Sequence, residues 1–336
     1  MEDDQDRHAR KGLPLSTLRT TDPEVAAAGL AAGNIAALPT ETVYGLGALA
    51  ASPTAIKRLY EVKGRPADHP VIVHVSGTDA LDAWARAVPN SALKLADTFW
   101  PGPLTLVLPR SELAHDQITG GQPTVAVRAP AHPLFRDVLA RLESELGHDI
   151  GVAAPSANRF GRVSPTTASH VEAELGKRLR VGKDVILDGG QCAVGLESTI
   201  VIWAGPVWHI AREGGITREQ LSEVVDLASW GPVPERVPGA LASHYSPKAR
   251  LIVAESVAEA DVGLRRRIGL LALSSVETPK GWDRLAAPAT AGEYARVLYQ
   301  ALRLADERGV KLLVAVPPEP AGIGAAIRDR LARAST

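Results

Sequence analysis

Two short segments, far apart in the chain, carry side chains suited to phosphate chemistry. Residues 63–66 read Lys-Gly-Arg-Pro, and residues 156–158 read Ser-Ala-Asn. Lysine offers a point charge and arginine a planar fork for phosphate oxygens, so Lys63 and Arg65 together can neutralise a triphosphate. Ser156 and Asn158 add small hydrogen-bonding groups that can orient a polar reactant. The two segments therefore predict nucleotide chemistry.

The elements around these segments decide how the side chains are presented. Ser52 and Pro53 predict the start of a helix over residues 54–62, which places Lys63 and Arg65 on a surface loop after it. Two cations there could instead be solvated charges that complement the helix dipole. Pro66, however, holds Arg65 in an extended conformation, which makes the loop rigid.

Ser156 and Asn158 follow an apolar run over residues 150–155 that predicts a buried strand. Serine and asparagine are also common in simple turns, because their side chains bond nearby backbone. Ligands in open α/β sheets, however, bind beyond the ends of the strands. This position favours a binding role for Ser156 and Asn158.

The remaining pattern predicts two α/β domains. Buried strands are expected over residues 71–75, 104–108 and 124–128, and a hairpin over 198–212. Residues 45–47 are expected to leave the strand before them, and Ser164 to begin a helix that runs through Leu175. From residue 250 onward, strands alternate with helices over 293–308 and 323–334, which predicts a small unit with a largely parallel sheet. We expect a disordered tail (1–14), a catalytic domain (15–228), a linker or lid (229–249) and a C-terminal α/β domain (250–336).

Composition narrows the function classes. The formal net charge is −1, so bulk electrostatic attraction to nucleic acid is absent and little direct binding is expected. One cysteine, Cys192, cannot form an intramolecular disulfide or a thiolate-rich zinc site, which indicates the cytoplasm. No apolar stretch approaches the length of roughly 18 residues that crosses a bilayer, so no membrane partner is expected.

Three other kinds of site are disfavoured. Residues 45–50 match the letters of a dinucleotide-binding fingerprint, but Pro39 interrupts the strand before them and Ser52-Pro53 separates them from the next helix. His69 and His74 flank one strand and are expected on opposite faces, which argues against shared metal ligation. No G-x-S-x-G elbow supports a serine nucleophile.

Taken in order, seven segments resemble the motifs of the YrdC/Sua5 family, the threonylcarbamoyl-AMP synthases: residues 38–46, 63–66, 100–105, 127–130, 155–158, 197–200 and 212–214. Residues 238–247 and 322–331 further resemble the two-domain Sua5 branch of the family. The resemblance implies a YrdC-like twisted mixed sheet with a concave nucleotide pocket, followed by a small Rossmann-like α/β domain. It also implies that L-threonine, bicarbonate and ATP become threonylcarbamoyl-AMP and pyrophosphate. That product would pass to a transferase complex that modifies adenosine 37 of tRNA.

The resemblance also implies roles for individual residues. Lys63, Arg65, Ser156 and Asn158 match the family's nucleotide-binding and catalytic positions. Further ATP contacts are expected at the positions His69, Thr124, Ser164, Arg212, His244 and Tyr245. The L-threonine site is expected to comprise Thr40, Thr42, His74, Arg128 and Ser198, with Arg128 suited to the carboxylate.

Making a mixed carbamic–phosphoric anhydride needs positioning and charge neutralisation, without a protein nucleophile. Mg²⁺ is expected to accompany ATP, held mainly by the phosphates, with no dedicated metal site and no organic cofactor. An alternative of a different class is an RNA-binding or ribosome-maturation module of the same fold, which the near-neutral charge argues against.

Overall fold

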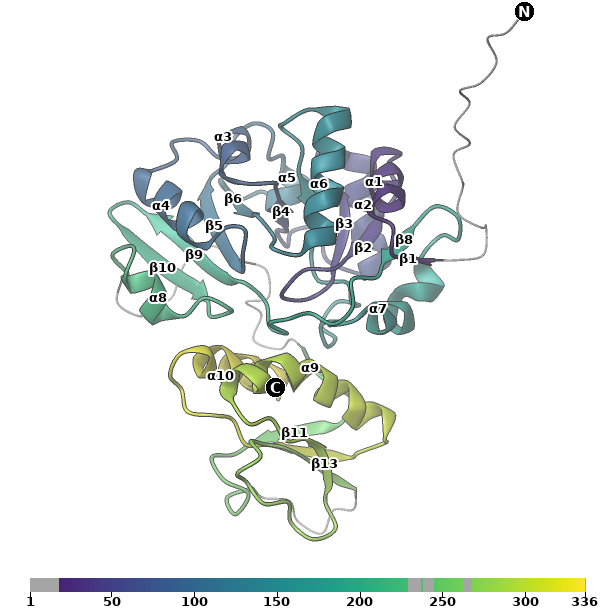
Figure 1. The fold of residues 1–336 in the computed structure, drawn as a ribbon, viewed down its shortest axis with the longest axis vertical. Coiled ribbons are helices and arrows are strands. Elements are labelled where there is room, and N and C mark those ends of the chain that lie inside the picture. The colour runs from purple at the N-terminus through teal and green to yellow at the C-terminus, as the bar shows by residue number, and fades with distance from the viewer. Residues whose placement is uncertain (1–17, 229–236, 238–244, 261, 263–266, 336) are drawn as a thin grey trace, which may run out of the picture.

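The computed structural model describes residues 18–228, 237, 245–260, 262 and 267–335. The expected tail (1–14), most of the linker (229–249) and His244 lie outside these described residues. The described chain forms two α/β units, the first coloured purple to teal and the second green to yellow in Figure 1. The predicted two-domain α/β fold is confirmed.

The first unit is built on a mixed ten-stranded sheet. Its order is β1-β8-β2-β3-β7-β4-β6-β5-β9-β10, and parallel and antiparallel pairs alternate irregularly across it. The strands are β1 (Arg19–Thr20), β2 (Ala36–Leu38), β3 (Gly45–Leu49), β4 (Ile72–His74), β5 (Leu104–Pro109), β6 (Thr124–Arg128), β7 (Val152–Ala153), β8 (Val185–Leu187), β9 (Thr199–Ala204) and β10 (Val207–Arg212).

Helices cover both faces of this sheet. One face packs on α1 and α6 through an apolar cluster that includes Leu30 and Phe135. The other packs on α2, α3, α4 and α7 through a larger cluster that includes Leu59 and Trp84. The helices are α1 (Pro23–Ala31), α2 (Pro53–Lys63), α3 (Leu81–Trp84), α4 (Asn90–Phe99), α5 (Asp116–Thr119), α6 (Pro133–Leu146), α7 (Ala168–Leu175) and α8 (Arg218–Ser222), with 3₁₀ turns η1 (Thr78–Ala80) and η2 (Gly176–Arg178).

Two local expectations were wrong. Residues 45–47 begin strand β3, because Gly47 lets neighbouring strands approach closely: a Cβ there would lie 2.9 Å from side-chain atoms of both Leu38 and Val152. Helix α7 begins at Ala168 instead of near Ser164, because Thr167 is its N-cap and accepts a bond from the His170 N–H. Ser164 is thereby released for another contact, described below.

The second unit is a four-stranded parallel sheet in the order β11-β14-β12-β13. Its elements are β11 (Arg250–Val253), β12 (Ile268–Leu271), β13 (Asp283–Ala286), α9 (Ala291–Glu307), β14 (Leu312–Ala315) and α10 (Ile323–Ala334). Strand β13 was not expected, since its sequence has no apolar run. Helices α9 and α10 lie on the side of this sheet that faces the first unit (Figure 1).

The two units share a buried interface. Val43, Val163 and Leu196 of the first unit belong to the same apolar cluster as Leu298 and Tyr299 of α9. Gly195 has φ +79°, and a Cβ there would lie 2.5 Å from the Arg296 Cα, so the two backbones are in close contact. The units are therefore packed together, not merely joined by a linker.

Candidate active site

A central pocket lies at the carboxyl ends of β4 and β6. Its cavity volume is about 50 Å³. Its lining residues come from both the strand ends and the following loops: Thr40, Thr42, Val43, Gly45, Arg65, Ile72, His74, Arg128, Ala154, Pro155, Ser156, Glu197, Ser198, Arg212 and Tyr245. We call this set the central pocket.

Arg128 anchors one end of the central pocket. Its Nη2 donates to Glu41 Oε1 (2.6 Å), its Nη1 to Thr42 Oγ1 (3.0 Å) and its Nε to the Gly102 carbonyl (3.2 Å). A guanidinium has five N–H donors, so two remain for a ligand. Glu41 also accepts from the Ala131 N–H (3.0 Å), which fixes the pair.

The two threonines beside Arg128 are not equivalent. Thr40 Oγ1 bonds the Val43 carbonyl (2.7 Å) and accepts from the backbone N–H groups of Thr42 and Val43, so it shapes the turn. Thr42 Oγ1 bonds Thr40 Oγ1 (2.8 Å) and accepts from Arg128. Of the two, Thr42 is therefore the one linked directly to the arginine.

Hydroxyl groups on β5 and immediately before β9 continue the polar wall. Ser198 Oγ lies 2.8 Å from Thr105 Oγ1 and accepts from Arg212 Nη2 (3.0 Å). Arg212 also donates to the Ser198 carbonyl from Nε (3.1 Å) and Nη2 (2.8 Å). Arg212 is buried, and its positively charged side chain lines the same pocket as Ser198.

Arg65 lies in the pocket wall and is buried, with 8% of its surface exposed. Its Nη2 donates to the Pro70 carbonyl (2.7 Å), and its guanidinium lies 5.8 Å from the Phe160 ring centroid. His69 meets the edge of the same ring, with centroids 5.3 Å apart. His69 is thus next to Arg65 but outside the pocket lining.

The expectation that Lys63 and Arg65 are cations on a surface loop was wrong, because both side chains are buried. Lys63 is the last residue of α2 and is 2% exposed. Its Nζ donates to the carbonyls of Ser156 (2.6 Å) and Asn158 (2.8 Å), and burial, followed by the nearby Arg65 charge, lowers the pKa of Lys63 well below its usual range. Lys63 therefore shapes the loop that carries Ser156, which does line the pocket.

Asn158 plays a similar part in that loop. Its Nδ2 donates to the carbonyls of Arg159 (2.8 Å) and Arg162 (2.7 Å), and the residue is fully buried. Neither Lys63 nor Asn158 belongs to the pocket lining. The structure thus brings all four signature residues together, with Arg65 and Ser156 at the pocket surface and Lys63 and Asn158 beneath it.

Two acidic pocket residues were not assigned roles from the sequence. Glu41 pairs with Arg128, and Glu197 accepts from Ser164 Oγ (2.7 Å). Both stand in the segments that carry the family resemblance, and an acidic residue inside a run of apolar and hydroxyl residues was the signal available. Ser164 lies behind Glu197 and does not line the pocket itself.

His74 is buried in the pocket wall and stacks on Phe135, with ring centroids 5.3 Å apart. Its Nδ1 is buried without a hydrogen-bond partner among the described residues. Burial, with a further contribution from the Arg128 charge, lowers the pKa of His74 to about 3. A neutral imidazole with an unused nitrogen suits a polar ligand.

Thr124 lies at the opposite end of β6 from Arg128. It begins β6, whereas Arg128 ends it, and at roughly 3.3 Å per residue the two are about 13 Å apart along the strand. Thr124 is outside the pocket lining, while Tyr245 is within it. His244 is outside the described residues.

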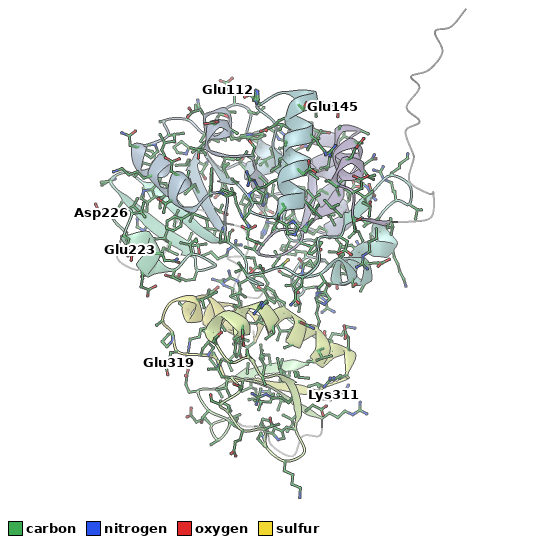
Figure 2. The ribbon with its side chains drawn as sticks, viewed as in Figure 1. Glu112, Glu145, Glu223, Asp226, Lys311 and Glu319 are labelled. Atoms are coloured by element: carbon green, nitrogen blue, oxygen red, sulfur yellow. The ribbon has the colours of Figure 1, made fainter. Side chains whose placement is uncertain are left out.

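Charges elsewhere are scattered. Glu112, Glu145, Glu223 and Asp226 of the first unit and Glu319 of the second project outward in Figure 2. Over the described chain, no group of three or more histidine, cysteine, aspartate or glutamate side chains is arranged to hold a metal ion. None of the helices described is both long and apolar enough to span a membrane.

Comparison with known proteins places this geometry in a family. A family model described as telomere recombination, Sua5/YciO/YrdC, matches residues 28–214, and one described as the C-terminal domain of threonylcarbamoyl-AMP synthase matches residues 216–336. The chain belongs to the YrdC/Sua5 family.

Full-length relatives support the two-domain branch. The threonylcarbamoyl-AMP synthase of Pyrococcus abyssi is 37% identical over 93% of both chains, and that of Bacillus subtilis is 38% identical over 95% of this chain and 94% of its own. The solved structure of P. abyssi Sua5 complexed with L-threonine superposes with a TM-score of 0.80 at 34% identity, covering 95% of this chain and 97% of that one. These findings confirm the predicted family, fold and synthase class, and they favour the enzyme over the RNA-binding alternative.

Proposed function

We propose that the central pocket condenses L-threonine, bicarbonate and ATP into threonylcarbamoyl-AMP and pyrophosphate. One observation carries the proposal: the guanidinium groups of Arg65, Arg128 and Arg212 are all buried and all line one pocket. Buried guanidinium groups that converge on one pocket suit an anionic ligand. A polyphosphate beside the carboxylate of an amino acid is a ligand of this kind.

The pocket divides into two ends. At the threonine end, the two remaining N–H groups of Arg128 would receive the substrate carboxylate, with Thr42, His74 and Ser198 near its amine and hydroxyl. The relative solved with L-threonine supports a threonine site in this fold. At the nucleotide end, Arg65 and Arg212 would neutralise the phosphates, while Ser156 orients them.

The reaction needs no nucleophile from the protein. The threonine amine and bicarbonate give a carbamate and water. A carbamate oxygen then attacks the α-phosphorus, and the bond to pyrophosphate breaks. Holding the carbamate in line with the α-phosphate in a pocket that neutralises charge accounts for the rate enhancement. Mg²⁺ would arrive with ATP and be held mainly by its phosphates.

The product would serve N6-threonylcarbamoylation of adenosine 37 in tRNA, carried out by a separate transferase complex in the cytoplasm. The synthase itself need not bind tRNA, since its substrates are small molecules. The near-neutral net charge agrees with this separation.

The direct test measures pyrophosphate release with ATP, Mg²⁺ and bicarbonate, with and without L-threonine. We expect release that depends on threonine, and ¹³C from labelled bicarbonate in the adenylate product. Arg65→Gln should reduce turnover by roughly a hundredfold, because a charge-assisted phosphate contact is lost. Threonine-independent release, or full activity of Arg65→Gln, would contradict the proposal.

A further inference from the structure

Arg330, on helix α10 of the second unit, is completely buried although it is charged. Its Nε donates to Glu197 Oε2 (2.8 Å) and its Nη2 to the Glu213 carbonyl (2.8 Å), both in the first unit. Its Nη1 pairs with the neighbouring Asp329. A buried guanidinium of the second unit therefore makes two of its hydrogen bonds to the first unit.

A second side chain from the C-terminal unit reaches the same carboxylate. The Tyr299 hydroxyl, on helix α9, donates to Glu197 Oε2 (2.7 Å), while Ser164 holds Oε1 (2.7 Å). Both carboxylate oxygens of Glu197 are therefore fixed, and two of the three donors belong to the second unit.

Arg330 also supports a neighbouring part of the pocket wall. Its guanidinium lies 5.4 Å from the ring centroid of Tyr245, and the Tyr245 and Tyr299 rings are 5.5 Å apart. Glu197 and Tyr245 both line the central pocket. Arg330 and Tyr299 thus stand directly behind two wall residues without lining the pocket themselves.

The contacts from Arg330 and Tyr299 matter for the pocket because Glu197 is charged. Burial by itself raises the pKa of Glu197, but the guanidinium groups of Arg330 and Arg212 outweigh it and bring the pKa down to about 2. The wall of a pocket that must hold polyphosphate therefore contains an ionised carboxylate. Without a matched cation, that carboxylate would repel the phosphates and compete for Arg212.

We propose that Arg330 and Tyr299 are positioning residues for the nucleotide end of the pocket, so that the C-terminal unit completes the active site. Arg330 neutralises the Glu197 carboxylate, and Arg330 and Tyr299 together hold it toward the interface, which weakens its repulsion of the phosphates. This inference rests on the proposed function, because it requires a nucleotide in the central pocket.

The test uses the full chain and four variants. Arg330→Met removes the cation, Tyr299→Phe removes one hydroxyl and keeps the ring, and Arg330→Met with Glu197→Gln removes both charges of the pair. Arg328→Met is the matched control, since Arg328 lies on the same helix and pairs with Glu255 within its own unit. Binding of a non-hydrolysable ATP analogue and of L-threonine is measured by calorimetry, together with the melting temperature.

We expect Arg330→Met to weaken nucleotide binding on the order of tenfold and threonine binding far less. Tyr299→Phe should weaken nucleotide binding by a few-fold, and the double variant should recover most of the loss. If Arg330→Met does not fold, the nucleotide affinities of Tyr299→Phe and of the double variant still test whether these contacts support nucleotide binding. Arg328→Met should bind both ligands as the wild type does.

Two results would overturn the inference. One is wild-type nucleotide affinity in both Tyr299→Phe and Arg330→Met; the other is an equal loss of affinity for the nucleotide and for L-threonine. The first would mean that these contacts only hold the units together. A wild-type protein that binds neither ligand would instead refute the proposed function, which keeps the two failures distinct.

Discussion

At the scale of single residues, Arg128 combines contacts within the protein with donors that remain for a ligand. It forms a buried ion pair with Glu41, and it keeps two donors for a ligand. Arg128→Gln should raise the threonine KM by roughly ten- to a hundredfold and change the ATP KM little, because a charged hydrogen bond to the amino acid is lost. It should also lower the free energy of unfolding by about 3 kcal/mol or more, since Glu41 remains buried and unpaired.

Steady-state kinetics and urea unfolding check the Arg128 prediction. Arg136→Gln, an exposed arginine on α6, serves as the control and should change neither quantity. Equal increases in both KM values would remove Arg128 from the threonine site.

The second prediction at this scale concerns the protonation of His74. Because burial lowers its pKa to about 3, His74 should stay neutral from pH 5 to pH 8, and its imidazole NMR signals should not shift over that range. The unfolded chain binds a proton near pH 6.5, so protonation favours the unfolded state. Above about pH 6.5 the imidazole is neutral in both states, so the free energy of unfolding keeps its full value. As the pH falls from 6.5 toward 3, protonation of the unfolded chain lowers the free energy of unfolding by up to about 1.4 kcal/mol per pH unit.

The stability comparison uses the wild type and His74→Asn between pH 4.5 and 7.5. The wild type should lose more stability than the variant on acidification, whereas His170, also shifted downward, contributes equally to both. An imidazole that titrates near pH 6.5 in the folded protein would contradict this assignment.

At the scale of elements, the end of α2 and the loop after β7 form one unit through Lys63. Lys63→Met should abolish most activity and also destabilise the fold by about 3 kcal/mol, because the carbonyls of Ser156 and Asn158 lose a buried donor. This differs from a surface cation, whose removal would cost little stability.

Lys57→Met on the same helix is the control, because Lys57 is exposed. Pyrophosphate release and urea unfolding are measured for both variants. A Lys63→Met protein that is inactive but as stable as the wild type would show that Lys63 acts on the nucleotide directly and not through the loop.

At the scale of the whole molecule, the two units should unfold together. They share one apolar cluster and the buried Arg330–Glu197 pair, so opening one exposes the surface of the other. We expect a single calorimetric transition whose van't Hoff and calorimetric enthalpies agree. Two resolved transitions in the wild type would mean that the interface contributes little.

The sequence by itself determined many of the helices and strands and the class of chemistry. Capping residues located α2, the apolar runs located β4 and β6, and the ordered motifs identified the family and several of the pocket residues. These features are local, because a cap or an alternating run depends on neighbours within a few residues.

Only the tertiary structure decided which charges face the pocket and which support it. Lys63 is a buried brace instead of a loop cation, Thr124 is separated from Arg128 by the length of a strand, and Glu197 is held by Arg330 of another unit. The physical reason is that burial and ion pairing are set by segments remote in sequence, and the Arg330–Glu197 contact joins positions 133 residues apart. The residue types indicate which side chains could bind the substrates, and packing between distant segments determines which of them line the pocket and which support its wall.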